Sequence, residues 1–432
     1  MNRLGLVPWA LVGVFASVAE ARPIEFRVFD DVNGDGKQGN DEPGVPAIVS
    51  YSGMPLFVPT DADGRVTLEV ENGIAWVRVP SGFRPGPVWA QLDGKSRIDF
   101  ALRRWAPPPG PLTFVATSDS HSSFAHPFWS DLEPAAYAAT RADPPPAFFT
   151  ILGDLTQNTT PAQFVLQDRL LANLDVTYVP VPGNHDWYDG GKAWRVHYGP
   201  DNYSFDIGDV HFVVWNMMMR DEDTKAFFTN ELRDVAPEMT VVAMTHGPPS
   251  PAVVAKLREL GVDYVLSGHT HTNRVVDHGG MIELNHEPML MGGLDFTPGG
   301  YRIITIDRDV LTSEHRTTVG EPSIRSVAPA RRQCQPPGGG AIIAATEIDP
   351  RGGTVTARVD CGTPIALSYG GGWSWRGTLP ALAPGEHSLT LDAITSDGER
   401  LSSTTGIEVC SAETGTLAGI EWPQLGGNSA HT

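Results

Sequence analysis

The sequence predicts a central α/β region flanked by two small all-β regions. Buried apolar strands recur in the central region with helix-like stretches between them, which is typical of α/β folds. In both flanking regions, short apolar runs alternate with turn signals, which indicates strands joined by turns. Proline-rich segments at residues 105–111 and 326–340 separate the three regions.

The composition fits a globular protein that is rich in β structure and loops. Hydrophobic residues make up 41% of the 432 residues, enough for a large buried core. Charged residues make up only 19%, whereas 46 glycines and 37 prolines supply many turns, so disorder is not expected. The formal net charge of −20 repels polyanions, which argues against nucleic acid as a partner.

The N-terminal segment has the layout of a secretory signal peptide. Arg3 precedes an apolar run over residues 4–18, and residues 19–21 close the segment with an A-x-A pattern. A membrane anchor is the alternative, although the run is short for a membrane span. We therefore expect residues 1–21 to be removed and the mature protein to be exported, either periplasmic or extracellular.

The first flanking region, residues 22–104, is expected to form a β-sandwich. The central α/β region covers residues 112–319, and the last β region covers residues 341–412. The tail, residues 413–432, contains glycine and serine and is expected to be loosely ordered.

Three cysteines occur, all in the last quarter of the chain. An oxidising compartment permits one disulfide among Cys334, Cys361 and Cys410 and leaves one thiol over. The sequence does not choose the pair.

Five segments of the central region share one arrangement, in which an apolar strand leads into polar residues of the kinds that bind metals. These residues are Asp119 and His121 after residues 112–118, Asp154 after 147–152, Asn184, His185 and Asp186 after 176–182, His246 after 239–245, and His269 and His271 after 262–267. Because ligands of open α/β sheets lie beyond the carboxyl ends of the strands, we expect the five ends to converge on one cavity.

These side chains suit a pair of transition metals. Imidazoles and carboxylates favour Zn, Fe or Mn over Ca, and a carboxylate such as Asp154 can bridge two cations. Two cations about 3.5–4 Å apart activate a shared water and clamp phosphoryl oxygens during in-line displacement. A histidine that binds no metal can then protonate the leaving alkoxide. Each motif alone is a weak signal, but the five in order predict a two-metal site.

The central region resembles the calcineurin-like metallophosphoesterase family. That family carries D-x-H, G-D, G-N-H-[DE], H and G-H-x-H in this order, and all five motifs are intact here. The resemblance covers residues 112–319 and implies a four-layer α/β/β/α metallophosphoesterase sandwich. Residues 29–36 and 295–302 further resemble features of exported bacterial members that carry an extra β domain at each end.

The resemblance also implies roles for single residues. The first metal would be held by Asp119, His121, Asp154 and His271, and the second metal by Asp154, Asn184, His246 and His269. His185 would be the general acid, with Asp186 as its support.

A separate acidic segment satisfies the spacing of an EF-hand calcium loop. Asp31, Asn33, Asp35 and Glu42 occupy the oxygen-ligand positions of D-x-[DN]-x-[DN]-G-x5-E. The preceding residues are strand-like and Pro43 follows at once, so a helix-flanked sensor is not expected. The segment predicts a single structural calcium site, and an acidic turn without metal is the alternative.

Several other residues have an ordinary structural interpretation beside a functional one. Tyr203 and His211 are expected in or near the core, whereas His286 could line the cavity after the last ligand segment. Trp373 and Trp375 could form an exposed binding surface or anchor a small β core.

The leading hypothesis is an exported binuclear-metal phosphoesterase that hydrolyses phosphate mono- or diesters by a metal-bridged hydroxide. Its expected partner is a small-molecule, lipid or cell-envelope phosphoester, and no span after residue 21 could cross a bilayer. One alternative is a secreted surface- or carbohydrate-binding protein with a degenerate catalytic core, which would bind without metal-dependent turnover. The other is a nuclease of the same superfamily, which a salt-sensitive DNA-binding assay would separate.

Overall fold

The computed structural model describes residues 21–410, except residues 53, 126–128, 143, 296, 319–323, 330–333, 347, 349–351, 371–373 and 396–397. The expected signal peptide, apart from Ala21, and the expected tail lie outside the described residues. The chain divides into two compact units, one of Met1–Arg78 with Val88–Arg104 and the other of Val79–Pro87 with Trp105–Thr432. Within the described residues, no helix is long and apolar enough to cross a membrane.

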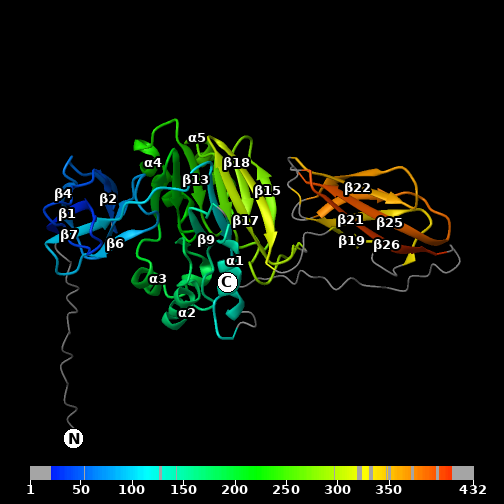
Figure 1. The fold of residues 1–432 in the computed structure, drawn as a ribbon, viewed down its shortest axis with the longest axis horizontal. Helices are drawn as coiled ribbons and strands as arrows, with labels where there is room; N and C mark the ends of the chain where they lie inside the picture. The colour runs from blue at the N-terminus through cyan, green and yellow to red at the C-terminus, as the bar shows by residue number, and fades with distance from the viewer. Residues whose placement is uncertain are drawn as a thin grey trace, which may run out of the picture. The chain divides into compact units, whose positions relative to one another are not determined.

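The described part of the first unit is built of strands (blue to cyan in Figure 1). A three-stranded sheet has the order β4-β1-β7, and a four-stranded sheet has the order β3-β2-β5-β6. Fully buried Ile24, Phe26 and Val28 alternate along β1 with partly exposed Glu25 and Arg27, so one face of this strand packs into the core. The strands are β1 (Arg22–Asp30), β2 (Ile48–Tyr51), β3 (Met54–Pro59), β4 (Arg65–Val70), β5 (Ile74–Arg78), β6 (Val88–Gln91) and β7 (Arg97–Leu102).

The second unit begins with two mixed sheets. The five-stranded sheet has the order β10-β9-β8-β17-β18, and the six-stranded sheet has the order β11-β12-β13-β14-β16-β15. The strands of the first are β8 (Leu112–Thr117), β9 (Phe148–Leu152), β10 (Thr177–Val181), β17 (Gly300–Asp307) and β18 (Val310–Thr317). Those of the second are β11 (Tyr203–Ile207), β12 (Val210–Val214), β13 (Thr240–Met244), β14 (Tyr264–Ser267), β15 (Arg274–Asp277) and β16 (Ile282–Asn285).

Aromatic rings join the two mixed sheets. Phe212 of β12 lies 5.5 Å from Phe114 of β8 and 5.2 Å from Phe148 of β9, between ring centroids, and all three side chains are fully buried. Edge-to-face contacts at these distances add to the apolar burial of the rings. The core that holds the site-bearing strands together is therefore shared by both sheets.

Helices cover these sheets, so the α/β class expected for the central region is confirmed (Figure 1). Buried residues of α1, α2 and α3, including Leu132, Phe164 and Trp194, share one apolar cluster with Phe149 and Ile151 of β9. The four-layer order stays a prediction. The helices are α1 (Leu132–Ala139), α2 (Pro161–Leu171), α3 (Lys192–His197), α4 (Asp221–Glu231) and α5 (Pro251–Glu259), with 3-10 turns η1 (Trp129–Asp131), η2 (Asn184–Asp186) and η3 (Leu232–Asp234).

The rest of the second unit is an eight-stranded sheet with the order β19-β21-β24-β23-β22-β25-β26-β20. Trp375 is buried in its core and contacts the ring of Tyr369, whereas Trp373 lies outside the described residues. The strands are β19 (Ile324–Ala328), β20 (Cys334–Gln335), β21 (Gly340–Thr346), β22 (Thr354–Val359), β23 (Ile365–Tyr369), β24 (Ser374–Leu379), β25 (Gly385–Ile394) and β26 (Arg400–Val409). The proline-rich segment expected to separate two regions thus contributes β20 and most of β19.

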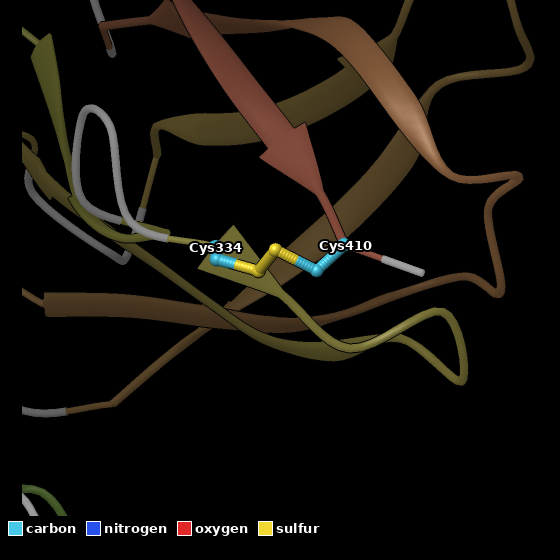
Figure 2. Close-up of a disulfide and its surroundings, with 2 residues drawn as sticks. All are labelled: Cys334 and Cys410. Carbon is cyan, nitrogen blue, oxygen red and sulfur yellow. A yellow bond between two sulfur atoms is a disulfide. The ribbon is translucent and has the colours of Figure 1, made fainter. Parts of the chain in front are cut away.

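A disulfide joins Cys334 of β20 to Cys410, directly after β26 (Figure 2). The two Cα atoms are 5.6 Å apart although the residues are separated by 76 positions. Cys361 is exposed and carries a free thiol.

Candidate metal centre

The seven expected metal ligands follow the carboxyl ends of five strands. Strands β8, β9 and β10 run parallel in one sheet, and β13 and β14 run parallel in the other. Asp119 and His121 follow β8, Asp154 follows β9, Asn184 follows β10, His246 follows β13, and His269 and His271 follow β14. Parallel strands end at the same edge of a sheet, so each sheet presents its ligands together.

Hydrogen bonds between the loops hold the strand ends in register. The backbone N–H of His121 donates to the carbonyl of Asp154 over 2.8 Å, and that of Gly268 donates to the carbonyl of His246 over 2.7 Å. The N–H of His269 donates to Oδ2 of Asp119 over 3.2 Å, which links the loop after β14 to the loop after β8. The loops of the two sheets therefore form one connected framework.

Strained backbone is concentrated at the expected ligands. Eight described residues other than glycine have positive φ, and five of them are Asp119, His121, Asp154, His269 and His271. Such backbone conformations cost about 1–3 kcal/mol of free energy each, and they cluster at functional sites. In this loop geometry Asp119 and His121 reach the same group of candidate ligands, whereas His269 and His271 reach neighbouring groups.

The first group of candidate ligands consists of Asp119, His121 and His271. One possible ligand atom from each lies within 4.8 Å of those of the other two. Oδ1 of Asp119 is 3.1 Å from Nε2 of His271 and 3.7 Å from Nε2 of His121. Asp119 is buried, and burial raises its pKa, but His246, His121 and His271 outweigh this effect and hold the pKa well below its usual range.

The second group consists of Asp154, His246 and His269, whose possible ligand atoms also lie within 4.8 Å of one another. Nδ1 of His246 lies 2.6 Å from the carbonyl of Leu152, which leaves Nε2 to face the carboxylates. Burial lowers the pKa of His246, but Asp154 and Asp119 together outweigh burial and raise it to about 9. The carboxylates thus attract positive charge into this position.

Asp154 lies between the two groups. Its Oδ2 is 3.1 Å from Nε2 of His246 and 3.8 Å from Nε2 of His121. Its Oδ1 accepts a hydrogen bond from the backbone N–H of His185 over 2.8 Å. One carboxylate therefore reaches a histidine of each group.

Unsatisfied atoms show that these residues fit metal ions. Oδ1 of Asn184 and Nε2 of His246 are buried and have no hydrogen-bond partner among the described residues. Leaving such atoms unpaired is costly, whereas coordination of a cation would satisfy both. Carboxylate, imidazole and amide donors around one point suit divalent transition metals.

The ring of His185 lies beside the two groups. Nδ1 contacts the carbonyl of Gln157 at 2.7 Å, and the ring centroid is 4.7 Å from that of His121. His185 also joins His121 and Asp154 in a third group of possible ligands. When Nδ1 donates its proton to Gln157, Nε2 is the ring nitrogen that does not contact this carbonyl.

Asp186 is placed differently from its expected role as the support of the His185 ring. Its buried carboxylate accepts hydrogen bonds from the N–H groups of Leu155, Thr156 and Gly183 over 2.8–3.0 Å. Burial raises its pKa to about 7, although those three N–H groups act in the opposite direction. Asp186 therefore braces the loop that carries Asp154, and Gln157 orients the His185 ring.

Sequence reasoning missed Asn285, at the end of β16. Its Nδ2 donates to Oγ of Ser267 over 2.9 Å and to the carbonyl of Gly268 over 2.7 Å, and its Oδ1 accepts a hydrogen bond from Thr272 over 2.8 Å. These contacts hold both ends of the loop that carries His269 and His271. The signal was available, because Asn285 ends a buried strand parallel to β14.

The remaining candidates are buried. The Tyr203 hydroxyl donates to the carbonyl of Pro180 over 2.7 Å, and His211 lies between Asp206 and Glu231, as expected for core residues. His286 is also buried, with Nδ1 near the carbonyl of Ser267, and burial lowers its pKa to about 3. His286 is therefore a neutral imidazole behind the last ligand loop.

Residues 112–273 match the family model described as calcineurin-like phosphoesterase. The match begins at the first residue of β8 and ends two residues after His271, so it includes all seven candidate ligands of the transition-metal centre. The chain thus carries a calcineurin-like phosphoesterase domain over these residues. No curated protein matches the sequence.

Several solved structures are similar to parts of the chain. GAP50, described as the anchor in the inner membrane complex of Plasmodium, has 13% identity and a TM-score of 0.38, covering 48% of this chain and 85% of its own. An archaeal phosphodiesterase has 14% identity and a TM-score of 0.29, covering 48% and 100%. Purple acid phosphatase PPD1 of yellow lupin has 12% identity and a TM-score of 0.35, covering 91% and 70%.

Proposed function

We propose that this protein is an exported phosphoesterase that hydrolyses phosphate mono- or diesters at a binuclear metal centre within a four-layer α/β/β/α domain. The observation that supports this most is the position of Asp154. Its Oδ2 lies 3.1 Å from His246 and 3.8 Å from His121, so one carboxylate can serve two cations. The family match over residues 112–273 supports the same reaction class.

Two sets of side chains would hold the metals. Asp119, His121, Asp154 and His271 form the first set, and Asp154, Asn184, His246 and His269 form the second. When bound, two such cations lower the pKa of water and neutralise charge on phosphoryl oxygens. Their identity is proposed as Mn, Fe or Zn, because nitrogen and oxygen donors are mixed in both sets.

His185 is proposed as the general acid. Its Nδ1 is engaged by the carbonyl of Gln157, so Nε2 is the atom that delivers a proton. Protonation of the departing alkoxide removes the charge that would otherwise slow its release. Asp186 and Gly183 keep the adjoining loop in place through a 3.0 Å hydrogen bond.

The substrate is proposed to carry an apolar group beside its phosphoester. Tyr188 is 60% exposed, and its ring centroid lies 5.1 Å from that of His185. Leu294 is 79% exposed, and its backbone N–H donates to the carbonyl of His271 over 2.7 Å. A lipid-like or aryl phosphoester would offer an apolar group to these exposed side chains, whereas a small polar ester would not.

Export is supported by two features. Residues 19–21 carry the A-x-A pattern, and the Cys334–Cys410 disulfide is of a kind that persists in oxidising compartments. A nuclease activity is disfavoured by the net charge of −20.

The test is a titration of the mature chain with Mn²⁺, Zn²⁺ and Fe²⁺ against p-nitrophenyl phosphate and bis-p-nitrophenyl phosphate. Turnover that requires added metal supports the phosphoesterase, and the ratio of the two rates separates monoesterase from diesterase. Metal binding without turnover on either ester would indicate that the enzyme accepts only a narrow range of natural substrates. The absence of both binding and turnover would contradict the proposal and favour a surface-binding protein.

A further inference from the structure

The loop between β1 and β2, in the first unit, brings three acidic side chains together. One oxygen each from Asp31, Asp35 and Glu42 lies within 4.8 Å of the other two. Asp31 and Glu42 are buried, with 5% and 6% of their surface exposed, although carboxylates are rarely buried without a partner. Bringing buried carboxylates this close costs free energy unless a cation balances them.

One buried oxygen of Asp31 has no hydrogen-bond partner among the described residues, which is evidence for such a cation. Oδ1 of Asp31 is inaccessible to solvent and has no hydrogen-bond partner among the described residues. The other oxygen, Oδ2, accepts a hydrogen bond from the N–H of Gly36 over 3.3 Å and lies 3.7 Å from Nε of Arg103. The Arg103 side chain is 61% exposed, so it is well hydrated, and its contact is with Oδ2 of Asp31 rather than Oδ1.

The loop also orients its last carboxylate. Oε1 of Glu42 accepts a hydrogen bond from the N–H of Asn33 over 3.2 Å, and Oε2 accepts one from the N–H of Gly39 over 2.7 Å. Both oxygens are thereby directed into the loop rather than toward solvent. The base of the loop is closed by the N–H of Asp30, which donates to the carbonyl of Pro43 over 3.0 Å.

We propose that Asp31, Asn33, Asp35 and Glu42 bind one structural Ca²⁺ ion that stabilises the first unit. Only oxygen donors are supplied, at the first, third, fifth and twelfth positions of the loop, and Ca²⁺ is the common cation that takes such a set. A strand precedes the loop and Pro43 follows it, so no helix flanks the site and ion binding would not reorient one. Its role is therefore to hold β1 to the chain that leads into β2, independently of the phosphoesterase centre.

The test compares the mature wild-type chain with Asp35→Asn, after removal of metals with a chelator. Asp35 is exposed, so this substitution removes a ligand charge without disturbing the core. Asp41→Asn is the matched control, because Asp41 is exposed in the same loop but occupies none of the four ligand positions. Calcium affinity and stoichiometry are measured by calorimetric titration, and unfolding is followed by differential scanning calorimetry with Ca²⁺, Mg²⁺ or chelator.

We expect wild type and Asp41→Asn to bind one Ca²⁺ with the same affinity and to unfold at a higher temperature in Ca²⁺ than in chelator. Asp35→Asn should bind at least about tenfold more weakly, because affinity follows the ligand charge count, and should lose the thermal shift. The proposal is overturned if Ca²⁺ does not bind, if Asp35→Asn binds as wild type does, or if Mg²⁺ gives the same shift as Ca²⁺. Calcium binding elsewhere in the chain would appear equally in all three proteins.

Discussion

Nε2 of His246 lies 3.1 Å from Oδ2 of Asp154, yet it has no partner with hydrogen-bond geometry among the described residues. Both side chains are buried. An imidazole nitrogen and a carboxylate oxygen held this close in a buried site are placed as two ligands of one cation would be. The same carboxylate oxygen is 3.8 Å from His121, which belongs to the other group.

His185→Gln should lower turnover of a diester with a poor alkyl leaving group by about 10²–10⁴-fold while metal content stays unchanged. A nitrophenolate leaving group needs little proton transfer, so its release should be affected much less. Steady-state kinetics on the two esters measures the difference. His387→Gln, in β25, removes a histidine far along the chain and serves as the control. Equal losses on both esters would exclude the general-acid role.

Asn285→Ala should weaken metal binding by about 10–100-fold, because the loop of His269 and His271 loses its hydrogen-bond anchor. The unpaired carbonyl of Gly268 should also lower the free energy of unfolding by about 1–3 kcal/mol. Competition with a fluorescent chelator and urea unfolding measure the two effects. Asn173→Ala removes an exposed asparagine and should change neither. Unchanged metal affinity in Asn285→Ala would contradict the anchoring role.

Gly153→Ala should abolish activity, because a Cβ atom at this position would lie 2.5 Å from Cγ of His246. Gly190→Ala is a matched control. Both glycines have positive φ, of 85° and 74°, but a Cβ at Gly190 would meet nothing within 4 Å. The control variant should therefore be destabilised only by backbone strain, by about 1–2 kcal/mol, and should keep its activity. If both variants lose activity alike, the clash with His246 is not the cause.

Tyr188→Ala should lower kcat/KM for long-chain or aryl phosphoesters by about tenfold, which is the loss of roughly 1.4 kcal/mol of apolar contact. Short, polar esters should be hydrolysed as before. Because the side chain is 60% exposed, unfolding should hardly change. Tyr137→Ala removes an exposed tyrosine of α1 and is the control. A uniform loss over all esters would point to damage at His185 instead of a substrate contact.

The ligand positions could be predicted from the sequence because each motif directly follows a buried strand. Parallel strands end at one edge, so the order of Asp119, Asp154 and Asn184 along the chain is also their order across β8, β9 and β10. The α/β class followed from the same alternation of strands and helices. The strained φ angles of Asp119 and His271 could not be predicted, because Asp and His adopt such angles only where the surrounding loops require them.

Contacts between segments far apart in the chain could not be predicted from the sequence pattern. Asn285 acts on a loop that follows another strand, and nothing local to it distinguishes a loop anchor from a core amide. The pairing of Cys334 with Cys410 depends on β20 lying beside β26, a pairing of strands far apart in the chain. Proline and glycine near Cys334 indicated a linker, whereas long-range strand pairing made the segment part of a sheet.

The most direct measurement is the number of transition-metal ions per chain, determined by elemental analysis together with the rate of bis-p-nitrophenyl phosphate hydrolysis. Wild type and Asp175→Asn, which alters an exposed carboxylate, should each hold about two ions and turn over at the same rate. Asp154→Asn should hold fewer than two ions and lose turnover, because one side chain serves both positions. Two ions and full activity in Asp154→Asn would contradict the binuclear centre.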